Sequence, residues 1–415
     1  MAEKFSIRHI TFSDGERYKL MVDDFGVPYY YISLFITAHV RGAALSVSTI
    51  QNTLTALKMM CLWLQYYDID IEARFRRAEL LELQEIVALR DFTKKTLAEV
   101  QQSSSKVVDL FASRRDRGVA GVSQYFRMTV IADYLGFLAE TLTQHRADKE
   151  LPAQIEAMKK RIRAHRPKKK GRNAAHRVDS GIDQDVLDRL FHVMTPGSPD
   201  NPFVDVDVQI RNGLIIALLR NLGIRRGELL NVRVDDIDFT NNVLKVVRRP
   251  DSAADVRHYQ PLVKTRERTL PISSELVSKL SDYVLNYRNK FPKARRHPYL
   301  FVNHKAGPTQ GSPLSNAGFG KLMAQIKASA VPFGSVHAHA FRHSWNYGFS
   351  QSVDKAGDIS HEAEDQMRSF LMGWSPTSGT AATYNKRHIR EKATEAILQY
   401  QSELNGARKT DDQND

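Results

Sequence analysis

Apolar residues recur at intervals of three and four along two long segments in the first third of the chain, which is the spacing of one side of an α-helix. The first segment covers residues 48–67 and the second covers residues 123–142. Their apolar positions are Ile50, Leu54, Leu57, Cys61 and Leu64 in the first, and Phe126, Val130, Tyr134 and Phe137 in the second. Because polar residues fill the other sides, the pattern predicts amphipathic helices of a small bundle, with the aromatic rings in its core.

Short alternating patterns predict strands in two places. Within residues 1–32, the runs "RHITF" and "RYKLMV" stand on either side of the turn signal "SDGE". In the second half, three more short strands are expected over residues 241–249, 258–264 and 268–273, the last two joined by a tight turn. The rest of the second half is helical in pattern, and "VQIRNGLIIALLRNLG" is apolar enough to be a buried helix.

Length and charge narrow the class of protein. The chain has 415 residues, which favours two domains, and it carries 60 Lys and Arg against 47 Asp and Glu, a net charge of +13. Such an excess attracts polyanions, of which nucleic acid is the commonest, although a merely soluble basic protein is the alternative. Cys61 is the single cysteine, which excludes a disulfide scaffold or thiolate metal cluster and favours a reducing compartment. With neither a signal-peptide pattern nor an apolar run of spanning length, we expect a soluble intracellular protein.

The strongest local concentration of charge is "KKRIRAHRPKKKGR" at residues 159–172, which holds no acidic residue. Its Pro167 and Gly171 favour an exposed connector between two domains. The run is a solvated surface, a linker that lies along phosphates, or a localisation signal, and the sequence leaves all three open. Its candidate DNA-binding cations are Lys159, Lys160, Arg161, Arg163, Arg166, Lys168, Lys169, Lys170 and Arg172.

Candidate chemistry lies in the second half and is mostly cationic. The chain has no Walker loop, no GxGxxG after a strand, no HExxH and no GxSxG. In "LGIRRGELLNV", Arg225 falls at the junction of two buried helices, where a charge needs a bound anion or a partner such as Glu228. In "HAHAFRH", residues 337–343, the histidines suggest a metal site when read alone. On a helix, however, His339 and Arg342 share one side, as a phosphate grip would require.

Four motifs in order resemble the tyrosine recombinase (phage integrase) superfamily. They are "LGIRRGELLNVRVDDID", the lysine of "VKTRERTLPI", "HAFRHSW" and "LMGWSPTSGTAATYN", within residues 185–400. Two spacings depart by one residue from the family pattern: Lys264 lies seven residues before Pro271, and Trp374 lies ten before Tyr384.

The resemblance implies a role for each matching residue. Arg225 and Arg342 would clamp the scissile phosphate, Lys264 on a β-hairpin would act as general acid, and Tyr384 would be the nucleophile. His339 would act as base or hold phosphate, and the Trp374 indole would stabilise developing charge. Glu228 and His343 would have supporting roles. The family chemistry, cleavage and rejoining of DNA through a 3′-phosphotyrosine without ATP, implies neither a metal nor another cofactor.

The resemblance also implies a mainly α architecture, a helical core-binding bundle followed by a mostly helical catalytic domain with a small three-stranded antiparallel sheet. We expect an N-terminal extension at 1–32, which binds DNA arm sites or caps the bundle, and the DNA-binding bundle at 33–158. A basic linker at 159–182, the catalytic domain at 183–402 and a polar, disordered tail at 403–415 follow. By resemblance, we expect a terminal helix after Tyr384 that docks on a neighbouring copy or on its own domain.

The leading interpretation is a site-specific recombinase or integrase of a mobile element, in a bacterial cytoplasm and associated with the nucleoid. Its partners would be double-stranded DNA at a specific recombination site and sister recombinases. Four copies would form a tetramer in the synapse, and the chain would be a monomer when it is not bound to DNA. We expect no membrane partner. A type IB topoisomerase shares the chemistry but works alone. A DNA-binding accessory protein without activity is another class, and the complete residue set speaks against it. A zinc hydrolase built on the "HAHAFRH" histidines is a third class, and the lack of a partner cysteine or of a second carboxylate motif speaks against it.

Overall fold

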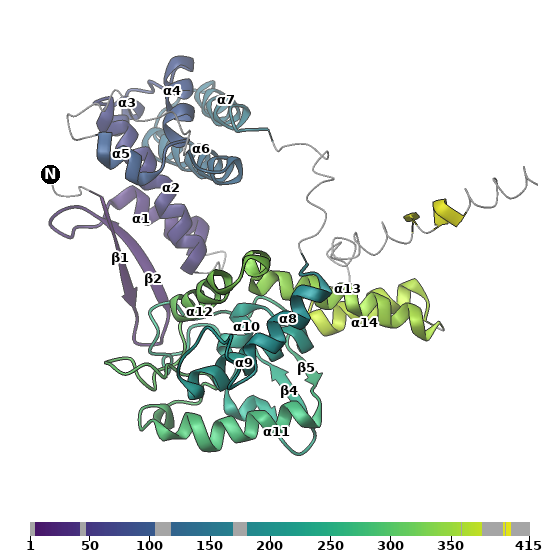
Figure 1. The fold of residues 1–415 in the computed structure, drawn as a ribbon. Coiled ribbons are helices and arrows are strands. Elements are labelled where there is room, and N and C mark those ends of the chain that lie inside the picture. The colour runs from purple at the N-terminus through teal and green to yellow at the C-terminus, as the bar shows by residue number, and fades with distance from the viewer. Residues whose placement is uncertain are drawn as a thin grey trace, which may run out of the picture. The chain divides into compact units, whose positions relative to one another are not determined.

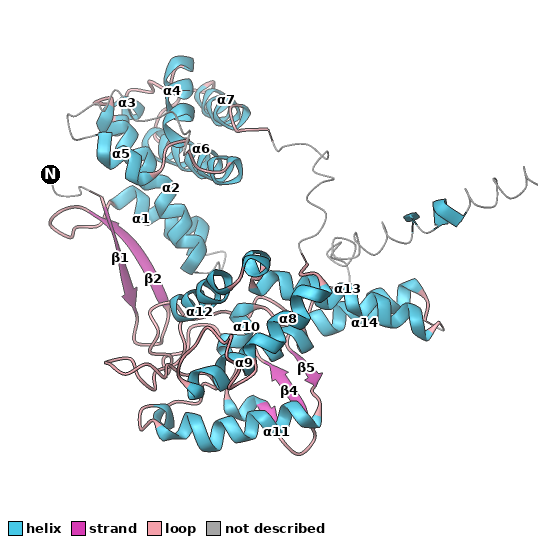
Figure 2. Cartoon of the chain, viewed as in Figure 1, coloured by secondary structure: helices cyan, strands magenta, loops and turns pink. Residues whose placement is uncertain are grey.

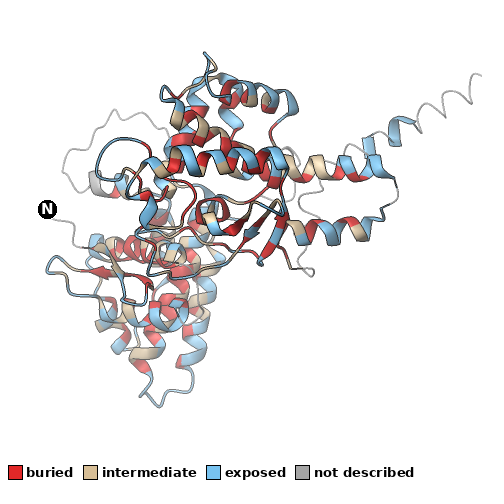
Figure 3. Cartoon of the chain, turned by 90° about the horizontal axis from the view of Figure 1, so that it is seen from below, coloured by how far each residue is buried: buried red, intermediate tan, exposed pale blue. Residues whose placement is uncertain are grey.

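The structure is a computed structural model that describes residues 5–41, 47–103, 118–168, 181–357 and 359–375, with two short stretches at 393–394 and 396–399. The chain divides into two compact units, residues 1–173 and 174–415. Helices dominate both units, and the few strands are short (Figures 1 and 2). In each unit the buried residues lie on the helix sides that face the unit's interior (Figure 3). The mainly helical fold class with small antiparallel sheets is therefore confirmed.

The first unit consists of a β-hairpin and a set of packed helices. Its elements are β1 (Ser6–Thr11), β2 (Arg17–Val22), α1 (Tyr30–Phe35) with a π-helical continuation (Ile36–Arg41), α2 (Val47–Tyr66), α3 (Ile71–Arg76), α4 (Leu83–Thr93), α5 (Leu97–Ser103), α6 (Gly121–Thr143) and α7 (Leu151–Ala164). Both sequence-predicted helices are present as α2 and α6. Of the aromatic residues expected in the core of α6, Tyr134 is buried and Phe137 half-buried, but Phe126 is exposed.

The N-terminal hairpin belongs to the core of this unit. β1 and β2 pair antiparallel from Ser6 opposite Val22 to Thr11 opposite Arg17, as the alternating pattern predicts. Tyr18 and Met21 of β2 are buried in the same hydrophobic cluster as α2 and α6, and the Lys19 ammonium donates to the Gln51 side chain of α2 at 2.6 Å. The hairpin therefore packs on the helices of its own unit, and both alternatives for the role of residues 1–32 stay predictions.

The predicted basic linker begins later than expected, because residues 159–164 form the last turns of α7. Ile162 is fully buried there, and a Cβ on Gly136 of α6 would overlap the Lys159 side chain. Close packing of α6 on α7 thus extends the helix through the first basic residues. Lys169, Lys170 and Arg172 lie outside the described residues.

The second unit surrounds the apolar helix α9. Its helices are α8 (Gln184–Met194), α9 (Val206–Leu222), α10 (Arg226–Asn231), α11 (Ser274–Asp282) with a π-helical continuation (Tyr283–Tyr287), α12 (Asn316–Ser329), α13 (Ala338–Ala356) and α14 (His361–Met372). Short 3₁₀ turns lie at Val234–Asp236, Arg288–Lys290, Ala294–Arg296 and Val331–Ser335. Side chains all around α9 are buried, and the helix packs against α8, α10, α11 and α13. It is therefore the central helix of the unit, as its apolar sequence predicts.

The three-stranded antiparallel sheet of this unit differs from the prediction in one strand. β4 (Val243–Val246) lies between β3 (Ile237–Asp238) and β5 (Arg268–Pro271), and Leu244 faces both Ile237 and Leu270. Residues 258–264 form no strand and pair with neither outer edge of this sheet. The prediction of a strand there, and of a β-hairpin carrying Lys264, was wrong.

Residues 247–267 instead form a long loop held by buried polar contacts. The Arg257 guanidinium is buried, pairs with Asp255 at 2.7 Å and donates to the Leu230 and Leu314 carbonyls. The Gln260 amide donates to the Arg249 carbonyl at 2.7 Å. These contacts supply hydrogen-bond partners to polar groups of the loop that strand pairing would otherwise supply. None of the helices in the described part of the chain is both long and apolar enough to cross a bilayer.

Candidate phosphate-binding site

The site begins where α9 ends and α10 starts. Gly223 ends α9 in the left-handed conformation (φ 58°), and a Cβ there would lie 2.8 Å from the Trp345 ring, so only glycine fits. Arg225 follows as the residue before α10 and is half-buried. The Glu228 carboxylate accepts from the Arg225 backbone N–H at 3.0 Å and lies 3.5 Å from its guanidinium. Glu228 thereby fixes both the start of α10 and the direction of the Arg225 side chain.

Glu228 is almost fully buried and has three further neighbours. The Thr265 hydroxyl donates to it at 2.6 Å, and the Arg268 guanidinium at 2.8 Å. Burial alone would raise the pKa of Glu228, but the Arg268 charge and hydrogen bond, the Thr265 hydroxyl and the Arg342 charge hold it below the ordinary value. Glu228 is therefore ionised, and Arg342 is close enough to contribute to that.

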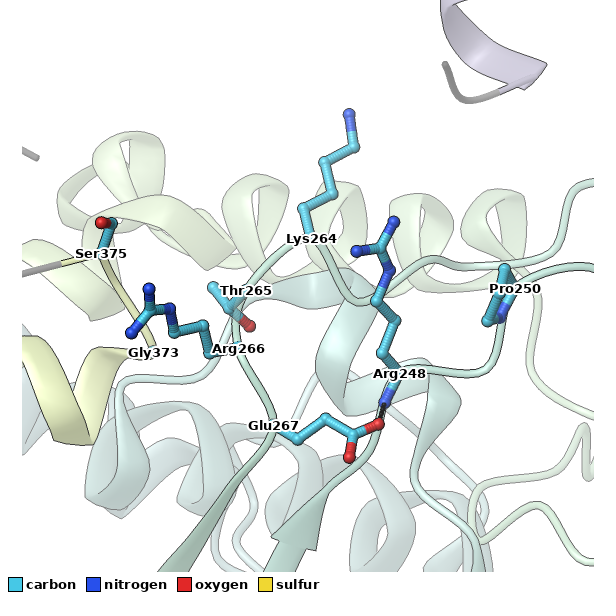
Figure 4. Close-up of a pocket in the computed structure, with 8 residues that line it drawn as sticks. All are labelled: Arg248, Pro250, Lys264, Thr265, Arg266, Glu267, Gly373 and Ser375. Atoms are coloured by element: carbon cyan, nitrogen blue, oxygen red, sulfur yellow. Dashed lines mark hydrogen bonds between the residues drawn. The ribbon is translucent and has the colours of Figure 1, made fainter. Parts of the chain in front are cut away.

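Lys264 lies on the loop that precedes β5. Val263 and Thr265 on either side are buried, which directs Lys264 to the surface. It lines a hollow of about 530 Å³ together with Arg248, Arg266 and Ser375. In Figure 4, Lys264 and Arg248 point the same way from neighbouring segments, while Glu267 turns to the Arg248 backbone N–H at 2.8 Å. The hollow therefore has a predominantly cationic lining.

α13 contributes the next group, Arg342, whose side chain is fully buried. Its guanidinium donates to the Gly223 carbonyl and to the Met372 carbonyl, both at 2.9 Å, and lies 5.2 Å from the centre of the Trp374 ring. One arginine thus connects the C-terminal ends of α9 and α14 beside Trp374, which is itself buried.

The two histidines near Arg342 are held in neutral form. Burial and the charges of Arg342 and Arg225 lower the pKa of His339 below its ordinary value. His343, whose ring meets the His339 ring edge to face at 4.7 Å, has its pKa lowered to about 4 by burial and by its positive neighbours. A neutral His339 can accept a proton.

His337 has a structural role that the sequence did not indicate. Its ring Nδ1 accepts from the Ala340 backbone N–H at 3.1 Å, which caps the start of α13. Among the described residues, no three His, Cys, Asp or Glu side chains gather in a way that could hold a metal ion.

The loop that carries Lys264 is attached directly to the turn that carries Trp374. Gly373 ends α14 in the left-handed conformation (φ 64°), and its carbonyl accepts from the Arg266 backbone N–H at 3.0 Å. On the other side, a Cβ on Gly227 of α10 would lie 2.5 Å from the Leu262 carbonyl oxygen. The loop is therefore pressed between α10 and the end of α14, which sets the position of Lys264 relative to Arg225 and Trp374.

The structure thus brings together most of the site residues that the sequence singled out, namely Arg225, Glu228, Lys264, His339, Arg342, His343 and Trp374. Tyr384 lies outside the described residues. Sequence reasoning missed Arg268, because a single arginine in "TRERTLP" carries no signal that distinguishes it from its neighbours.

The described basic residues at the end of the first unit divide into two groups. Lys159 pairs with Glu156 at 2.8 Å, Arg163 pairs with Asp133, and the Arg166 guanidinium lies 4.4 Å from the Tyr125 ring centre. These three cations therefore already have partners within their own unit. Lys160, Arg161 and Lys168 are exposed.

Part of the chain is similar to known proteins. Residues 181–356 match the family model described as the phage integrase family. Transposase A from transposon Tn554 of Staphylococcus aureus is 32% identical over 149 residues, which cover 34% of this chain and 39% of that protein. Tyrosine recombinase XerD of Halalkalibacterium halodurans is 26% identical over 136 residues, or 33% and 39% of the two chains. The chain thus spans about two fifths of the length of these curated relatives.

Solved structures were also found. A XerA recombinase is 17% identical and covers 88% of this chain and 98% of its own, with a TM-score of 0.36. The Tn1549 transposon integrase in complex with transposon right end DNA is 14% identical and covers 86% and 93%, with a TM-score of 0.45.

Proposed function

We propose that this chain, in which residues 181–356 form a domain of the phage integrase family, cleaves and rejoins DNA strands as a site-specific recombinase of a mobile element. The observation that carries the proposal is the grouping of Arg225, Arg342 and the Lys264 loop around one buried carboxylate. Two guanidinium groups and an ammonium near one point suit a phosphodiester, whose nonbridging oxygens accept from planar guanidinium forks.

In the proposed reaction, Tyr384 attacks the scissile phosphorus, so that a tyrosyl O–P bond forms and the P–O5′ bond breaks. The products are a 3′-phosphotyrosine and a free 5′-hydroxyl, and the same step in reverse joins a new 5′-hydroxyl without ATP. The ordinary pKa of tyrosine is about 10, and nearby guanidinium charges favour the phenolate during attack. Lys264, exposed at the rim of the hollow, protonates the leaving 5′-oxygen.

His339 and Arg342 complete the proposed site in different ways. A neutral His339 can take the tyrosine proton or donate a hydrogen bond to the phosphate, and its lowered pKa supports either role. Arg342 has no exposed surface, so a phosphate reaches it only after a local opening beside Trp374. The arginines and the Trp374 indole N–H then stabilise the charge of the pentacoordinate state, where the loss of one such donor costs about 10²–10³ in rate.

The proposed partner is double-stranded DNA at a specific recombination site. Exchange between two duplexes requires cleavage of four strands, which calls for four copies of the chain, alone or with sister recombinases, in the bacterial cytoplasm. Similarity to the Tn554 transposase supports a mobile element as the source. A type IB topoisomerase would use the same chemistry but relax supercoiled DNA as a monomer, so the number of copies on cleaved DNA distinguishes the two.

The test uses a duplex selected from a randomised pool for binding to the full chain. A nick is placed beside each candidate cleavage position, so that the short strand released with the 5′-hydroxyl diffuses away and the covalent protein–DNA adduct accumulates. We expect an adduct that resists SDS with the unmodified chain, and normal DNA binding but no adduct with Tyr384→Phe. Specific binding without any adduct would contradict the proposed activity and favour an accessory DNA-binding protein.

A further inference from the structure

One buried arginine outside the predicted site residues connects the elements that carry them. Arg268 begins β5, and only 1% of its side chain is exposed. Its guanidinium donates in three directions: to the Glu228 carboxylate at 2.8 Å, to the Thr265 hydroxyl at 3.1 Å and to the Leu371 carbonyl at 2.6 Å. A guanidinium is a rigid planar fork, so these three bonds fix three acceptors relative to one another.

Each acceptor lies next to a group of the proposed site. Glu228 holds the backbone and the guanidinium of Arg225. Thr265 directly follows Lys264 in the chain. Leu371 precedes Met372, whose carbonyl accepts from Arg342. A displacement of the Arg268 guanidinium is therefore transmitted to the positions of Arg225, Lys264 and Arg342 together.

Packing around Arg268 leaves no room for adjustment. A Cβ on Gly373 would lie 2.8 Å from Arg268 Nη1, so the turn before Trp374 rests directly on the guanidinium. Buried ion pairs contribute little to stability when compared with apolar residues of the same volume, because removal of both charges from water offsets their attraction. An arginine here thus gives a fixed geometry that an apolar residue of equal volume would not.

We propose that Arg268 is a positioning residue that sets the spacing of Arg225, Lys264 and Arg342 for DNA strand cleavage. The inference rests on the proposed function. Arg268 is covered by protein and does not reach the hollow beside Lys264, so its effect is on the rate of cleavage rather than on DNA affinity. Misplacement of reacting groups by about 1 Å costs on the order of 10²-fold in rate, which is the loss expected for Arg268→Met.

A matched control is available in the same unit. Arg288 is also buried, and its guanidinium donates to the carbonyls of Tyr299, Ala294 and His297, with no bond to a site residue among the described contacts. Arg288→Met therefore removes a buried guanidinium and leaves acceptors without a donor, as Arg268→Met does. It changes stability without changing the spacing of the proposed site.

The pH dependence supplies a second readout. Glu228 faces Arg225, Arg268 and Arg342, and removal of the Arg268 charge raises the pKa of the buried Glu228 carboxyl. Glu228 would then take up a proton at a higher pH, and the acid limb of the cleavage rate would move to higher pH in Arg268→Met. Arg288→Met leaves that limb in place.

The experiment measures single-turnover adduct formation on the nicked duplex, DNA dissociation constants and thermal unfolding, for the full chain and both variants. We expect a rate about 10²-fold lower and a shifted acid limb for Arg268→Met only, with DNA affinity unchanged in both. Arg268→Lys, which keeps the charge but bonds fewer acceptors, should recover part of the rate and restore the acid limb, and it takes the place of Arg268→Met if that variant does not fold.

Three outcomes separate the possible failures. No adduct with the unmodified chain would overturn the proposed function itself. An adduct rate for Arg268→Met within about tenfold of the unmodified chain at every pH would overturn the positioning role alone. Equal losses of cleavage rate in the Arg268 and Arg288 variants would also overturn the positioning role, because the slower cleavage would then result from lower stability of the unit.

Discussion

The contact between Gly373 and the Lys264 loop can be tested with two glycines that differ in one respect. Gly373 and Gly357 each end a helix in the left-handed conformation, with φ of 64° and 77°. A Cβ on Gly373 would lie 2.9 Å from both the Arg266 carbonyl oxygen and Thr265 Cβ, whereas a Cβ on Gly357 meets nothing within 4 Å. Gly→Ala at either position therefore places an alanine at positive φ, and only Gly373→Ala adds an overlap.

The expected losses in the free energy of unfolding follow from the backbone conformation and from the overlap. The left-handed conformation costs an alanine about 1–2 kcal/mol, which is the whole loss expected for Gly357→Ala. Forced overlap in a packed region adds about 1–3 kcal/mol, so Gly373→Ala should lose about 2–5 kcal/mol in all. The backbone on the other side of the contact, the Arg266 carbonyl, cannot move without displacing Lys264. We therefore also expect slower cleavage for Gly373→Ala and an unchanged rate for Gly357→Ala.

Urea unfolding followed by tryptophan fluorescence measures the first quantity, because Trp345 and Trp374 both lie in the second unit. Adduct formation on the nicked duplex measures the second. Equal shifts of the unfolding midpoint for the two variants would show that the Gly373 turn is not pressed against the loop, and the coupling between Lys264 and Trp374 would be refuted.

Three more expectations concern separate parts of the second unit. Arg248→Gln and Arg266→Gln should each lower the slope of log affinity against log salt by about one if these cations contact phosphate, and an unchanged slope would exclude that contact. In the folded chain the pKa of His343 is lowered to about 4 from an ordinary value near 6.5, so the unfolded chain takes up the proton first as the pH falls. The contribution of neutral His343 to the free energy of unfolding should therefore be complete above about pH 6.5 and decrease as the pH drops toward 4. His343→Gln should reduce this decrease in urea titrations. His337→Ala should lose about 1 kcal/mol of stability and His337→Asn little, since Asn also caps a helix, and equal losses would contradict the cap.

The sequence was informative where periodicity or an ordered motif decides the structure. The hairpin of β1 and β2 follows from alternation, and the helices α2 and α6 follow from their apolar spacing, because burial of one side is the main determinant of each. α9 follows from a sequence that is apolar enough to be buried all around. The site residues were found because the motifs occur in order, although they lie far apart in the chain.

The errors have tertiary causes. Residues 258–264 look like a strand, but they belong to a loop that is held by long-range contacts such as those of Arg257 with the Leu230 and Leu314 carbonyls, which no local pattern reveals. Arg268 acquires its role only through Glu228, forty residues earlier, and Leu371, 103 residues later. The capping role of His337 was not expected, because histidine is not among the usual helix-capping residues.

The most direct test of the central proposal is to map the covalent bond in the adduct. The adduct formed on the nicked duplex is digested with protease and nuclease, and the remaining phosphopeptide is sequenced by mass spectrometry. We expect a nucleotide joined through its 3′-phosphate to Tyr384, with EDTA present throughout. A phosphate on another residue, a 5′-linked nucleotide, or an adduct that persists in Tyr384→Phe would contradict the account.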